Sequence, residues 1–417
     1  MKRLREWLRQ LGPGLITGAA DDDPSGIATY SQAGARFGFL TLWTIVFTYP
    51  LMVGIQLVSA RIGRVTGHGL ASNIRRRFPR PVLYAIVLLL VVANTVNIAA
   101  DIAAMGEALE LVVGGPPHGY AVLFGVICLM LQVLMPYRRY VRYLKWLTLA
   151  LLSYVLVLLT IRVPWGLVAA HGVRPHLALG PDYLTVVVAV FGTTISPYLF
   201  FWQAAQEVEE LAADPRAGAL AHAPEGAGEH LRRIKIDTYL GMAFSNVVAF
   251  CIMLATAATL NAGGVTDIQT SAQAAEALRP LAGDFTFLLF ALGIIGTGLI
   301  AVPVLAGSAA YAVTESFEWR RGLDLKLLEA REFYAIIALA TLGGVALDFS
   351  PIDPIRALFW SAVANGVIAV PIMVVMMLLA DDRKVMGGFT VTRRLKALGW
   401  LATGTMAAAV AAMFATW

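Results

Sequence analysis

Charged residues are scarce in this chain. Only 14% of its 417 residues are Asp, Glu, Lys or Arg, whereas 58% are hydrophobic. Soluble domains carry about 25% charged residues, so this composition excludes a large soluble domain and is typical of an integral membrane protein. The longest polar stretches cover residues 207–237 and 315–331. We expect the first of them to be a solvated linker.

Cysteine is nearly absent, because only Cys128 and Cys251 occur and both fall in apolar runs. This excludes a disulfide framework and a cysteine zinc site, and we expect both thiols to pack among apolar side chains. No cofactor site is apparent. A cleavable signal peptide is not apparent either, since the first apolar run meets three aspartates instead of a small-residue cleavage site.

Long apolar runs are abundant, and hydropathy predicts eleven membrane-spanning helices. Their expected ranges are 12–36, 39–61, 82–112, 119–136, 144–164, 182–206, 238–261, 284–314, 332–347, 354–380 and 395–416. We therefore predict an all-α integral membrane protein, with residues 1–417 forming a single transmembrane domain in the lipid bilayer.

The distribution of basic residues predicts the orientation of these helices. If the N-terminus is cytoplasmic, the outer segments hold only 5 of the 32 Lys and Arg residues, namely Arg36, Arg162, Arg174, Arg279 and Arg356. The inner segments hold clusters such as Arg75-Arg76-Arg77 and Arg232-Arg233. We therefore expect a multi-pass protein of the inner (plasma) membrane, with a cytoplasmic N-terminus and an external C-terminus. The net charge of +5 reflects this topology and gives no indication of nucleic-acid binding.

The first predicted span is interrupted by Asp21-Asp22-Asp23-Pro24-Ser25-Gly26. The apolar residues 11–20 before it are too few to cross a hydrocarbon core, which requires about 20 helical residues. Acidic side chains at membrane depth are costly and indicate a functional site, while Pro and Gly supply a break in the helix. As an alternative, Asp23 is only the N-cap of a helix that begins at Pro24.

A matching interruption, Gly192-Thr193-Thr194-Ile195-Ser196-Pro197, lies in the sixth predicted span. Proline in a membrane helix is often only a kink, so this segment alone leaves a purely structural role open. The correspondence of the two breaks favours a transporter built from two five-helix repeats of opposite orientation. We predict repeats over about residues 12–164 and 182–380, followed by an extra helix at about 395–416.

The two breaks offer only oxygen ligands to a cation. The predicted metal-site residues are Asp23, Ala20 through its carbonyl, Thr193, Ser196 and the small Gly26, which leaves room for an ion that keeps several waters. No Cys, His or Met lies at either break, and oxygen ligands favour Mg²⁺ and Mn²⁺ over softer ions. We place Asp21 and Asp22 on the ion pathway, in the vestibule of the site.

Further polar residues in the spans are candidates for the ion pathway. Asn94, Asn97 and Asp101 share one face of the third span, at i, i+3 and i+7. The alternative for them is hydrogen bonding between helices, except that an unpaired acid such as Asp101 requires water or a cation at that depth. Asn365 on span ten is a further candidate, with helix packing as the alternative.

These residues resemble the Nramp family of divalent metal transporters, and the resemblance covers most of the chain. Gly12-Pro13-Gly14, Asp23-Pro24, Ala28-Thr29 and residues 32–38 follow the family's first span in order and spacing. Residues 192–197 stand where its sixth-span motif is expected. The resemblance implies a LeuT-like fold in which helices 1 and 6 are broken.

Two departures from the family pattern concern the choice of metal. Gly26 stands where classical members have a metal-binding Asn, and Ser196 stands where they have a metal-binding Met. The resemblance is therefore to the Nramp-related magnesium transporter branch, which implies a wider pocket with harder ligands.

Other departures concern proton coupling. Tyr198 and Gln203 stand at two family His positions, and Ala104 replaces the second acid of a pair whose first member is Asp101. These losses imply a carrier that works without proton symport.

The leading hypothesis is a secondary transporter, not an enzyme, which carries Mg²⁺ and Mn²⁺ as substrates by alternating access. One alternative is a proton-coupled Mn²⁺/Fe²⁺ symporter. Another is a LeuT-like amino acid or amine symporter, although three aspartates would repel a substrate carboxylate. An intramembrane enzyme using Asp23 and Asp101 as a carboxylate pair has no supporting local motif. We expect a monomer whose partners are the metal ion and the lipid bilayer.

Overall fold

The structure is a computed structural model that describes residues 13–135, 147–213, 218–350 and 353–417. Within these ranges all regular structure is helical and no strand is present. The prediction of an all-α membrane protein is confirmed for them. The beginning of the first predicted span with Gly12, the last residue of the fourth span and residues 144–146 of the fifth lie outside the described residues.

The first half of the chain forms a broken helix followed by long helices. In chain order the elements are α2 (Pro13–Asp21), α3 (Pro24–Phe37), the 3₁₀ turn η1 (Gly38–Thr41), α4 (Leu42–Thr66), α5 (Leu70–Arg77), α6 (Arg80–Val113), α7 (Pro117–Leu134), η2 (Leu147–Leu151), α9 (Leu152–Thr160) and α10 (Trp165–Val173).

The second half repeats the pattern of a broken helix followed by long helices. Its elements are α11 (Pro181–Thr194), α12 (Pro197–Ala213), α13 (Ala227–Thr256) with the π-helical η3 (Ala257–Asn261), α14 (Ser271–Ala275), η4 (Glu276–Leu278), α15 (Arg279–Ala282), η5 (Gly283–Phe285), α16 (Thr286–Phe317), α17 (Arg331–Asp348), α18 (Pro354–Asp381), α19 (Arg383–Met386) and α20 (Arg393–Thr416).

Every predicted span corresponds to helix where the structure describes it, but only eight helical stretches of the described residues are long and apolar enough to cross a membrane. The difference has three causes. α3 continues through η1 into α4, so the stretch from Pro24 to Thr66 counts once. α9 spans only nine residues, which is too short to cross a membrane. α17 is not apolar enough to be counted, because it carries charged residues in its first turn and at its last position.

The expectation of a solvated linker over residues 207–237 is wrong for most of that stretch. α12 continues to Ala213 and α13 begins at Ala227. Glu207 is fully buried and pairs with Arg233 across 2.9 Å. An ion pair between two neighbouring helices lets both extend beyond their apolar segments, which hydropathy alone does not indicate.

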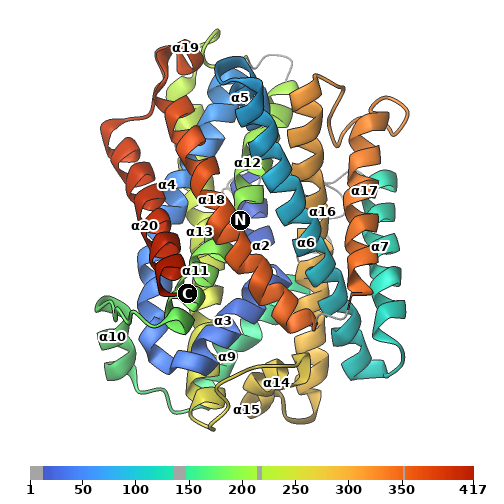
Figure 1. Cartoon of the computed structure of the whole chain (residues 1–417), viewed down its shortest axis with the longest axis vertical. Coiled ribbons are helices and arrows are strands. Elements are labelled where there is room, and N and C mark those ends of the chain that lie inside the picture. Colours follow the sequence, from blue (N-terminus) through green and yellow to red (C-terminus); the bar gives the residue numbers. More distant parts are fainter. Residues whose placement is uncertain (1–12, 136–146, 214–217, 351–352) are drawn as a thin grey trace, which may run out of the picture.

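The helices form two groups that meet along the middle of the molecule (Figure 1). In one group, α2 and α3 pack against α13, and α4 packs against α12 and α13. In the other, α6 packs against α7, α16 and α17. α18 joins the groups, since it contacts α6, α3 and α11, and α20 lies outside it on the edge opposite α7 and α17.

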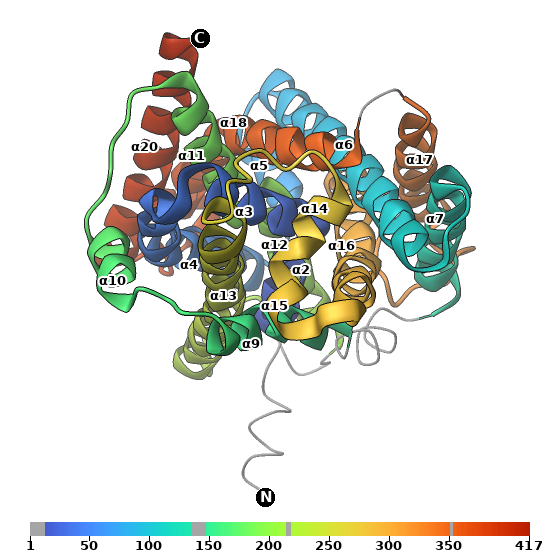
Figure 2. The same ribbon diagram turned by 90° about the horizontal axis from the view of Figure 1, so that it is seen from below.

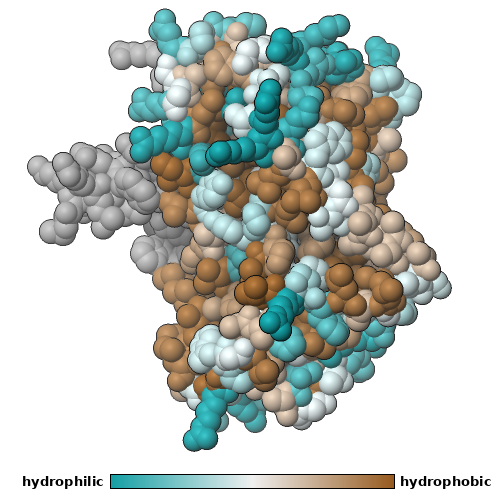
Figure 3. All heavy atoms as spheres, turned by 90° about the vertical axis from the view of Figure 1, so that its left-hand side faces the viewer, coloured by the Kyte–Doolittle hydropathy of each residue, from teal (hydrophilic) through white to brown (hydrophobic). Residues whose placement is uncertain are grey.

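The outer surface fits a lipid environment. Large apolar side chains such as Leu88, Leu134 and Leu339 are 64%, 71% and 71% exposed. Hydrophobic residues cover much of the middle of the face in Figure 3, and hydrophilic residues gather at its top. Seen from the opposite end, α10, α14 and α15 lie around the long helices (Figure 2). Both cysteines are buried, as predicted.

Glycines bring the broken helices against their neighbours. A Cβ on Gly18 of α2 would collide with the carbonyl of Gly241 in α13, and one on Gly14 would lie 2.9 Å from the backbone of Asp237. In the second half, a Cβ on Gly192 of α11 would collide with the Ala362 carbonyl in α18. Small residues at helix crossings are typical of membrane proteins, and here they fix the positions of both breaks.

We expect Gly18→Ala to destabilise the protein, because the added methyl group has no space between α2 and α13. Overpacking of this kind costs about 1–3 kcal/mol, so the thermal unfolding midpoint in detergent should fall measurably. The control is Gly404→Ala on α20, where no atom lies within 4 Å of the added Cβ and the effect should stay within about 0.5 kcal/mol. Equal midpoints for both variants would contradict the close crossing.

Candidate metal-binding site

Both predicted helix breaks are present and both are buried. α2 ends at Asp21 and α3 begins at Pro24, while α11 ends at Thr194 and α12 begins at Pro197. Asp23, Thr193 and Ser196 are only 2%, 1% and 1% exposed. The breaks therefore place polar side chains and free backbone groups in the interior of the helical bundle.

Asp23 is the N-cap of α3 and accepts hydrogen bonds with both carboxylate oxygens. Oδ1 accepts from the backbone N–H of Gly26 at 2.7 Å and from the Ser25 hydroxyl at 2.9 Å. Oδ2 accepts from the Asn97 amide at 3.1 Å and faces the Tyr198 hydroxyl at 3.4 Å. Capping thus uses only Oδ1, and Oδ2 is left to contact α6 and α12.

Tyr198 connects the two broken helices. Its hydroxyl lies 3.0 Å from the Ala20 carbonyl and 3.4 Å from Asp23 Oδ2, and the side chain is fully buried in the first turn of α12. One hydroxyl has a single hydrogen to donate, so it cannot satisfy both oxygens at once. The oxygens of two predicted metal ligands, the Ala20 carbonyl and Asp23 Oδ2, therefore face the same point, which the Tyr198 hydroxyl occupies.

Gly26 and Thr193 face each other across the two breaks. A Cβ on Gly26 would lie 3.2 Å from Thr193 Oγ1 and 3.4 Å from the Asp21 carbonyl oxygen. Thr193 Oγ1 is buried and has no hydrogen-bond partner among the described residues. An unpartnered buried hydroxyl is costly, and it offers a further oxygen beside the space that Gly26 leaves.

The Ser196 hydroxyl hydrogen-bonds to carbonyls at the end of α11, the helix just before it in the chain. Its hydroxyl lies 2.9 Å from the Gly192 carbonyl and 2.7 Å from the Thr193 carbonyl, the groups that the break leaves without helical partners. The two predicted ligands Ser196 and Thr193 thus lie together. Ser196 is available to an ion only through its oxygen lone pairs while its hydrogen serves a carbonyl.

The polar residues that share one face of α6 have two different roles, since one contacts the site and another packs against a neighbouring helix. Asn97 donates to Asp23 Oδ2 and accepts from the Ser361 hydroxyl of α18 at 2.6 Å. Asn94 instead donates to the Leu305 carbonyl at 2.8 Å and to Ser308 at 2.7 Å, both on α16. The structure therefore brings Asn97 to the site and gives Asn94 the packing role.

Asp21 and Asp22 are buried inside the helical bundle. They are 0% and 1% exposed, and both accept from the single hydroxyl of Ser245 on α13, Asp22 at 3.0 Å. One oxygen of each remains without a partner among the described residues. In this structure α13 covers the end of α2 through the close glycine crossing, and the assignment of both residues to the ion pathway stays a prediction.

Asp101 is a buried acid near the start of α3. Neither carboxylate oxygen makes a hydrogen bond of normal geometry within the described residues, although the carboxylate faces the backbone N–H of Ser25. It is 0% exposed. A carboxylate in this setting requires a proton or a cation.

The two remaining pathway candidates differ in their contacts. The Gln203 side-chain oxygen accepts from the Thr17 hydroxyl at 2.6 Å, which joins α12 to α2. Asn365 is 2% exposed on α18, and its Nδ2 has no partner among the described residues. Gln203 lies beside the first broken helix, and no contact brings Asn365 to the ligand oxygens.

Three residues at the site were not predicted from the sequence. Ser245 serves Asp21 and Asp22, Ser361 holds Asn97, and the Met105 sulfur packs against Gly298 of α16, close to Pro24. Ser245 and Ser361 are single hydroxyls in apolar helices, and their spacing carries no signal. Met105 is an ordinary apolar residue until the fold places it beside the break.

The donor set matches a hard cation. No three His, Cys, Asp or Glu side chains of the described residues come together in a way that could hold a metal ion. An ion at this position would therefore be held by one carboxylate, hydroxyls, carbonyls and its own waters. That ligand set suits Mg²⁺, which keeps several waters, and Mn²⁺.

The end of the molecule near α3 is closed by polar contacts. A cavity of about 420 Å³ reaches Ala28 and Gln32 of α3. Arg36 pairs with Asp182 at 2.8 Å across it, and the Gln32 amide donates to Asp267 at 2.8 Å. These contacts link α3 to α11 and to the segment before α14.

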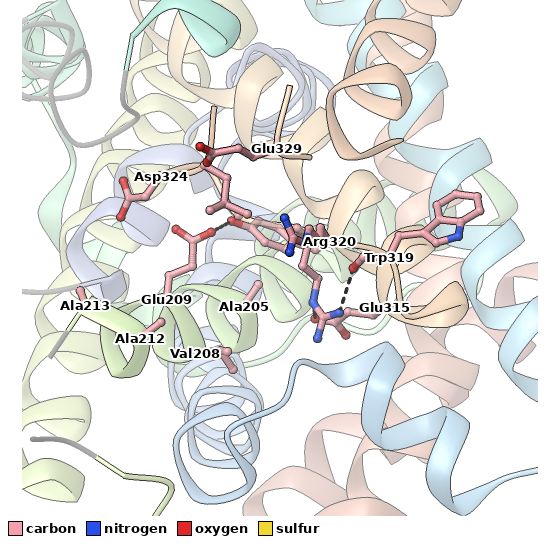
Figure 4. A pocket seen from close by; sticks show the side chains of 14 residues that line it. Ala205, Val208, Glu209, Ala212, Ala213, Glu315, Trp319, Arg320, Asp324 and Glu329 are labelled. Atoms are coloured by element: carbon pink, nitrogen blue, oxygen red, sulfur yellow. Dashed lines mark hydrogen bonds and ion pairs between the residues drawn. The ribbon is translucent and has the colours of Figure 1, made fainter. Parts of the chain in front are cut away.

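The opposite end carries a second cavity of about 630 Å³ between α12 and α16 (Figure 4). Glu209 of α12 accepts from the Tyr311 hydroxyl and, at 2.8 Å, from the backbone N–H of Leu323. This carboxylate joins α12, the second half of a broken helix, to α16 in the other helix group. The site is therefore closed toward both ends in this structure.

Known proteins share both the sequence and the fold of this chain. A family model described as Natural resistance-associated macrophage protein-like (Nramp) matches residues 14–416. The divalent metal cation transporter MntH of Yersinia pestis is 30% identical over 72% of this chain and 71% of its own length. MntH of Deinococcus radiodurans is 27% identical over 95% and 87%. The crystal structure of the Eremococcus coleocola manganese transporter matches with a TM-score of 0.74 at 20% identity, over 97% of this chain and 86% of that one.

We expect Tyr198→Phe to lower the thermal unfolding midpoint in metal-free detergent solution. The variant leaves the Ala20 carbonyl and Asp23 Oδ2 without their shared donor, and an unsatisfied buried polar group costs about 1–3 kcal/mol. Tyr84→Phe on α6 is the control, because Tyr84 is 46% exposed and its ring only stacks on Phe317. A midpoint unchanged in both variants would mean that the hydroxyl does not bridge the two helices.

Proposed function

This chain belongs to the Nramp family, and from this premise we propose that it is a secondary carrier of Mg²⁺ and Mn²⁺ that works without proton coupling. Its relatives are metal transporters and not enzymes. The observation that carries the proposal is the convergence of Asp23, the Ala20 carbonyl and the Thr193 hydroxyl at two buried helix breaks.

The proposed ion site uses these oxygens together with Ser196. A cation entering between the breaks replaces the Tyr198 hydroxyl as the partner of Ala20 and Asp23, and it gives Thr193 Oγ1 the partner that it lacks. Gly26 contributes no side chain at this point, where a Cβ would lie 3.2 Å from Thr193 Oγ1, so the ion can keep waters there once the neighbouring groups move apart. Mg²⁺ dehydrates reluctantly, so a pocket with a glycine at this point favours it over a pocket with a larger ligand.

Transport requires that the two closed ends open in turn. The two helix groups supply the parts for such a movement, since α2, α3, α11 and α12 carry the site and α6 and α16 face it. We propose that the group carrying the site moves against α6, α7, α16 and α17. We also propose the division into inverted repeats and an added C-terminal helix.

The membrane potential supplies the driving force for inward flux. A divalent ion gains about 4.6 kcal/mol per 100 mV, from 2.3 kcal/mol per elementary charge. We propose a multi-pass protein of the plasma membrane with α5 and α19 on the cytoplasmic side, where the basic clusters lie, and with an external C-terminus. The potential then draws the ion through the site without a second gradient.

A proton-coupled carrier of Mn²⁺ is the second candidate. The relatives are named as divalent metal or manganese transporters, and Asp101 is a buried carboxylate that would readily carry a proton. Against coupling, Tyr198 and Gln203 hydrogen-bond to Ala20 and Thr17 and supply no titratable imidazole near the site.

We expect Asp23→Asn to reduce Mg²⁺ uptake into proteoliposomes roughly tenfold to a hundredfold, because a charge-assisted ligand is worth about 1.5–3 kcal/mol. Asparagine still caps a helix, so the fold is retained. Internal pH is followed in parallel and should stay constant while the unmodified protein transports Mg²⁺. The control is Asp284→Asn at an exposed position.

Undiminished Mg²⁺ flux through Asp23→Asn would rule out this site. Mn²⁺ uptake with acidification and no Mg²⁺ flux in the unmodified protein would instead establish the proton-coupled candidate.

We expect the double variant Gly26→Asn/Ser196→Met to change the preferred ion from Mg²⁺ to Mn²⁺. The changes add a side-chain amide at the first break and a soft sulfur at the second break, and soft ligands disfavour Mg²⁺. The ratio of Mg²⁺ to Mn²⁺ uptake should fall about tenfold, which corresponds to about 1.4 kcal/mol. Gly26→Ala/Ser196→Ala removes space and oxygen without adding ligands, and it should lower both fluxes instead of changing their ratio.

A further inference from the structure

A basic cavity lies at the end of the molecule that carries α5 and α19, away from the metal site. Its volume is about 540 Å³, within the range of small-molecule pockets. Three segments far apart in sequence build it: the end of α4 with α5, the stretch before α13, and α19. The side chains that give it its character are His68, Arg76, His222 and Lys384.

The walls of this cavity are held in place by backbone and amide contacts. The backbone N–H of Ala221 donates to the Val65 carbonyl at 3.0 Å, which fixes the stretch before α13 on the last turn of α4. The Asn73 side-chain amide donates to the Thr66 hydroxyl at 3.0 Å and to the carbonyls of His68 and Gly69 at 2.9 Å. The cavity is therefore a built feature of the fold.

The basic side chains of this cavity are only partly paired with acids of the described residues. Of the three successive arginines on α5, Arg75 pairs with Glu318 and Arg77 pairs with Asp382. Arg76 and Lys384 form no ion pair among the described residues. Two acids lie near these basic residues: Glu318 interacts with Arg76 but pairs with Arg75, and Asp382 is already held by Arg77 and the backbone N–H of Lys384.

The surroundings of the cavity change the pKa of His68. Burial, followed by the charges of Arg76, Arg321 and His222, lowers the pKa of His68 below its ordinary value of 6.5. The part of this shift that comes from Arg76, Arg321 and His222 reflects a positive potential at His68, and a positive potential favours an anion nearby. The excess of basic residues at this end accounts for membrane orientation, but orientation alone does not require that unpaired cations converge on one cavity.

We propose that this cavity binds the phosphoryl group of an organic phosphate. Guanidinium, ammonium and imidazole groups are the side chains that hold phosphate oxygens, and the volume exceeds that of a phosphate ion, so the ligand carries an organic body. Such a ligand is an anionic lipid headgroup or a soluble nucleotide. It would join the α4–α5 turn, the stretch before α13 and α19, independently of which ion the protein carries.

The test measures thermal unfolding of the full chain in detergent with added short-chain phosphatidylglycerol, with ATP in EDTA, and with sodium sulfate at matched ionic strength. A ligand that binds only the folded protein raises the midpoint in a saturable way. We expect one of the two organic phosphates to do so, and which of them does identifies the source. The variant R76Q/K384Q should weaken that binding at least tenfold, whereas R80Q/K326Q, at exposed positions outside the cavity, should not.

Lys384→Arg keeps the charge and should retain binding, which guards against a variant that simply misfolds. The proposal is overturned if neither organic phosphate stabilises the unmodified protein. It is equally overturned if sulfate has the same effect as the organic phosphates, or if R76Q/K384Q folds and binds as the unmodified protein does.

Discussion

A helix that is broken inside a membrane leaves backbone N–H and C=O groups where no water can satisfy them. These groups need hydrogen-bond partners from the protein itself, and the rest of this structure depends on which residues supply them. Asp23 accepts from the first N–H groups of α3 through Gly26. Ser196 serves the last carbonyls of α11, and Tyr198 reaches across to the Ala20 carbonyl. The same groups that satisfy the breaks are the oxygens proposed for the ion. In the proposed site an ion would therefore replace the Tyr198 hydroxyl as the partner of the Ala20 carbonyl and Asp23.

Close packing determines where the breaks meet. Gly18 against Gly241 and Gly192 against α18 allow backbone contact at both breaks, and they bring Gly26 within reach of Thr193. The cost of this arrangement is the burial of four carboxylates, of which Asp23 has several donors, whereas Asp21, Asp22 and Asp101 keep oxygens without a partner among the described residues. A protein that transports cations has a reason to keep such charges in its interior, since the substrate itself neutralises them.

Charged contacts at the two ends have a different role from the buried acids. Arg36 with Asp182, Glu207 with Arg233, and Glu209 with Tyr311 join helices that belong to different parts of the bundle. The pair of Arg36 with Asp182 is partly exposed and contributes little stability, whereas Glu207 and Tyr311 are buried. In the movement proposed above, a partly exposed pair is suited to breaking and forming again.

The sequence by itself determined the all-helical membrane class, the two breaks and the residues at them, because long apolar runs and acids or prolines inside them leave few physical solutions in a bilayer. It also separated Gly26 and Ser196 from the classical family pattern. Only the tertiary structure decided that Asp21 and Asp22 lie under α13, that Asn94 packs on α16 while Asn97 reaches Asp23, and that Ser245 and Ser361 belong to the site. The reason is that helical periodicity places a side chain on a face, whereas the partner of that face is chosen by glycine crossings and hydroxyls far away in the chain.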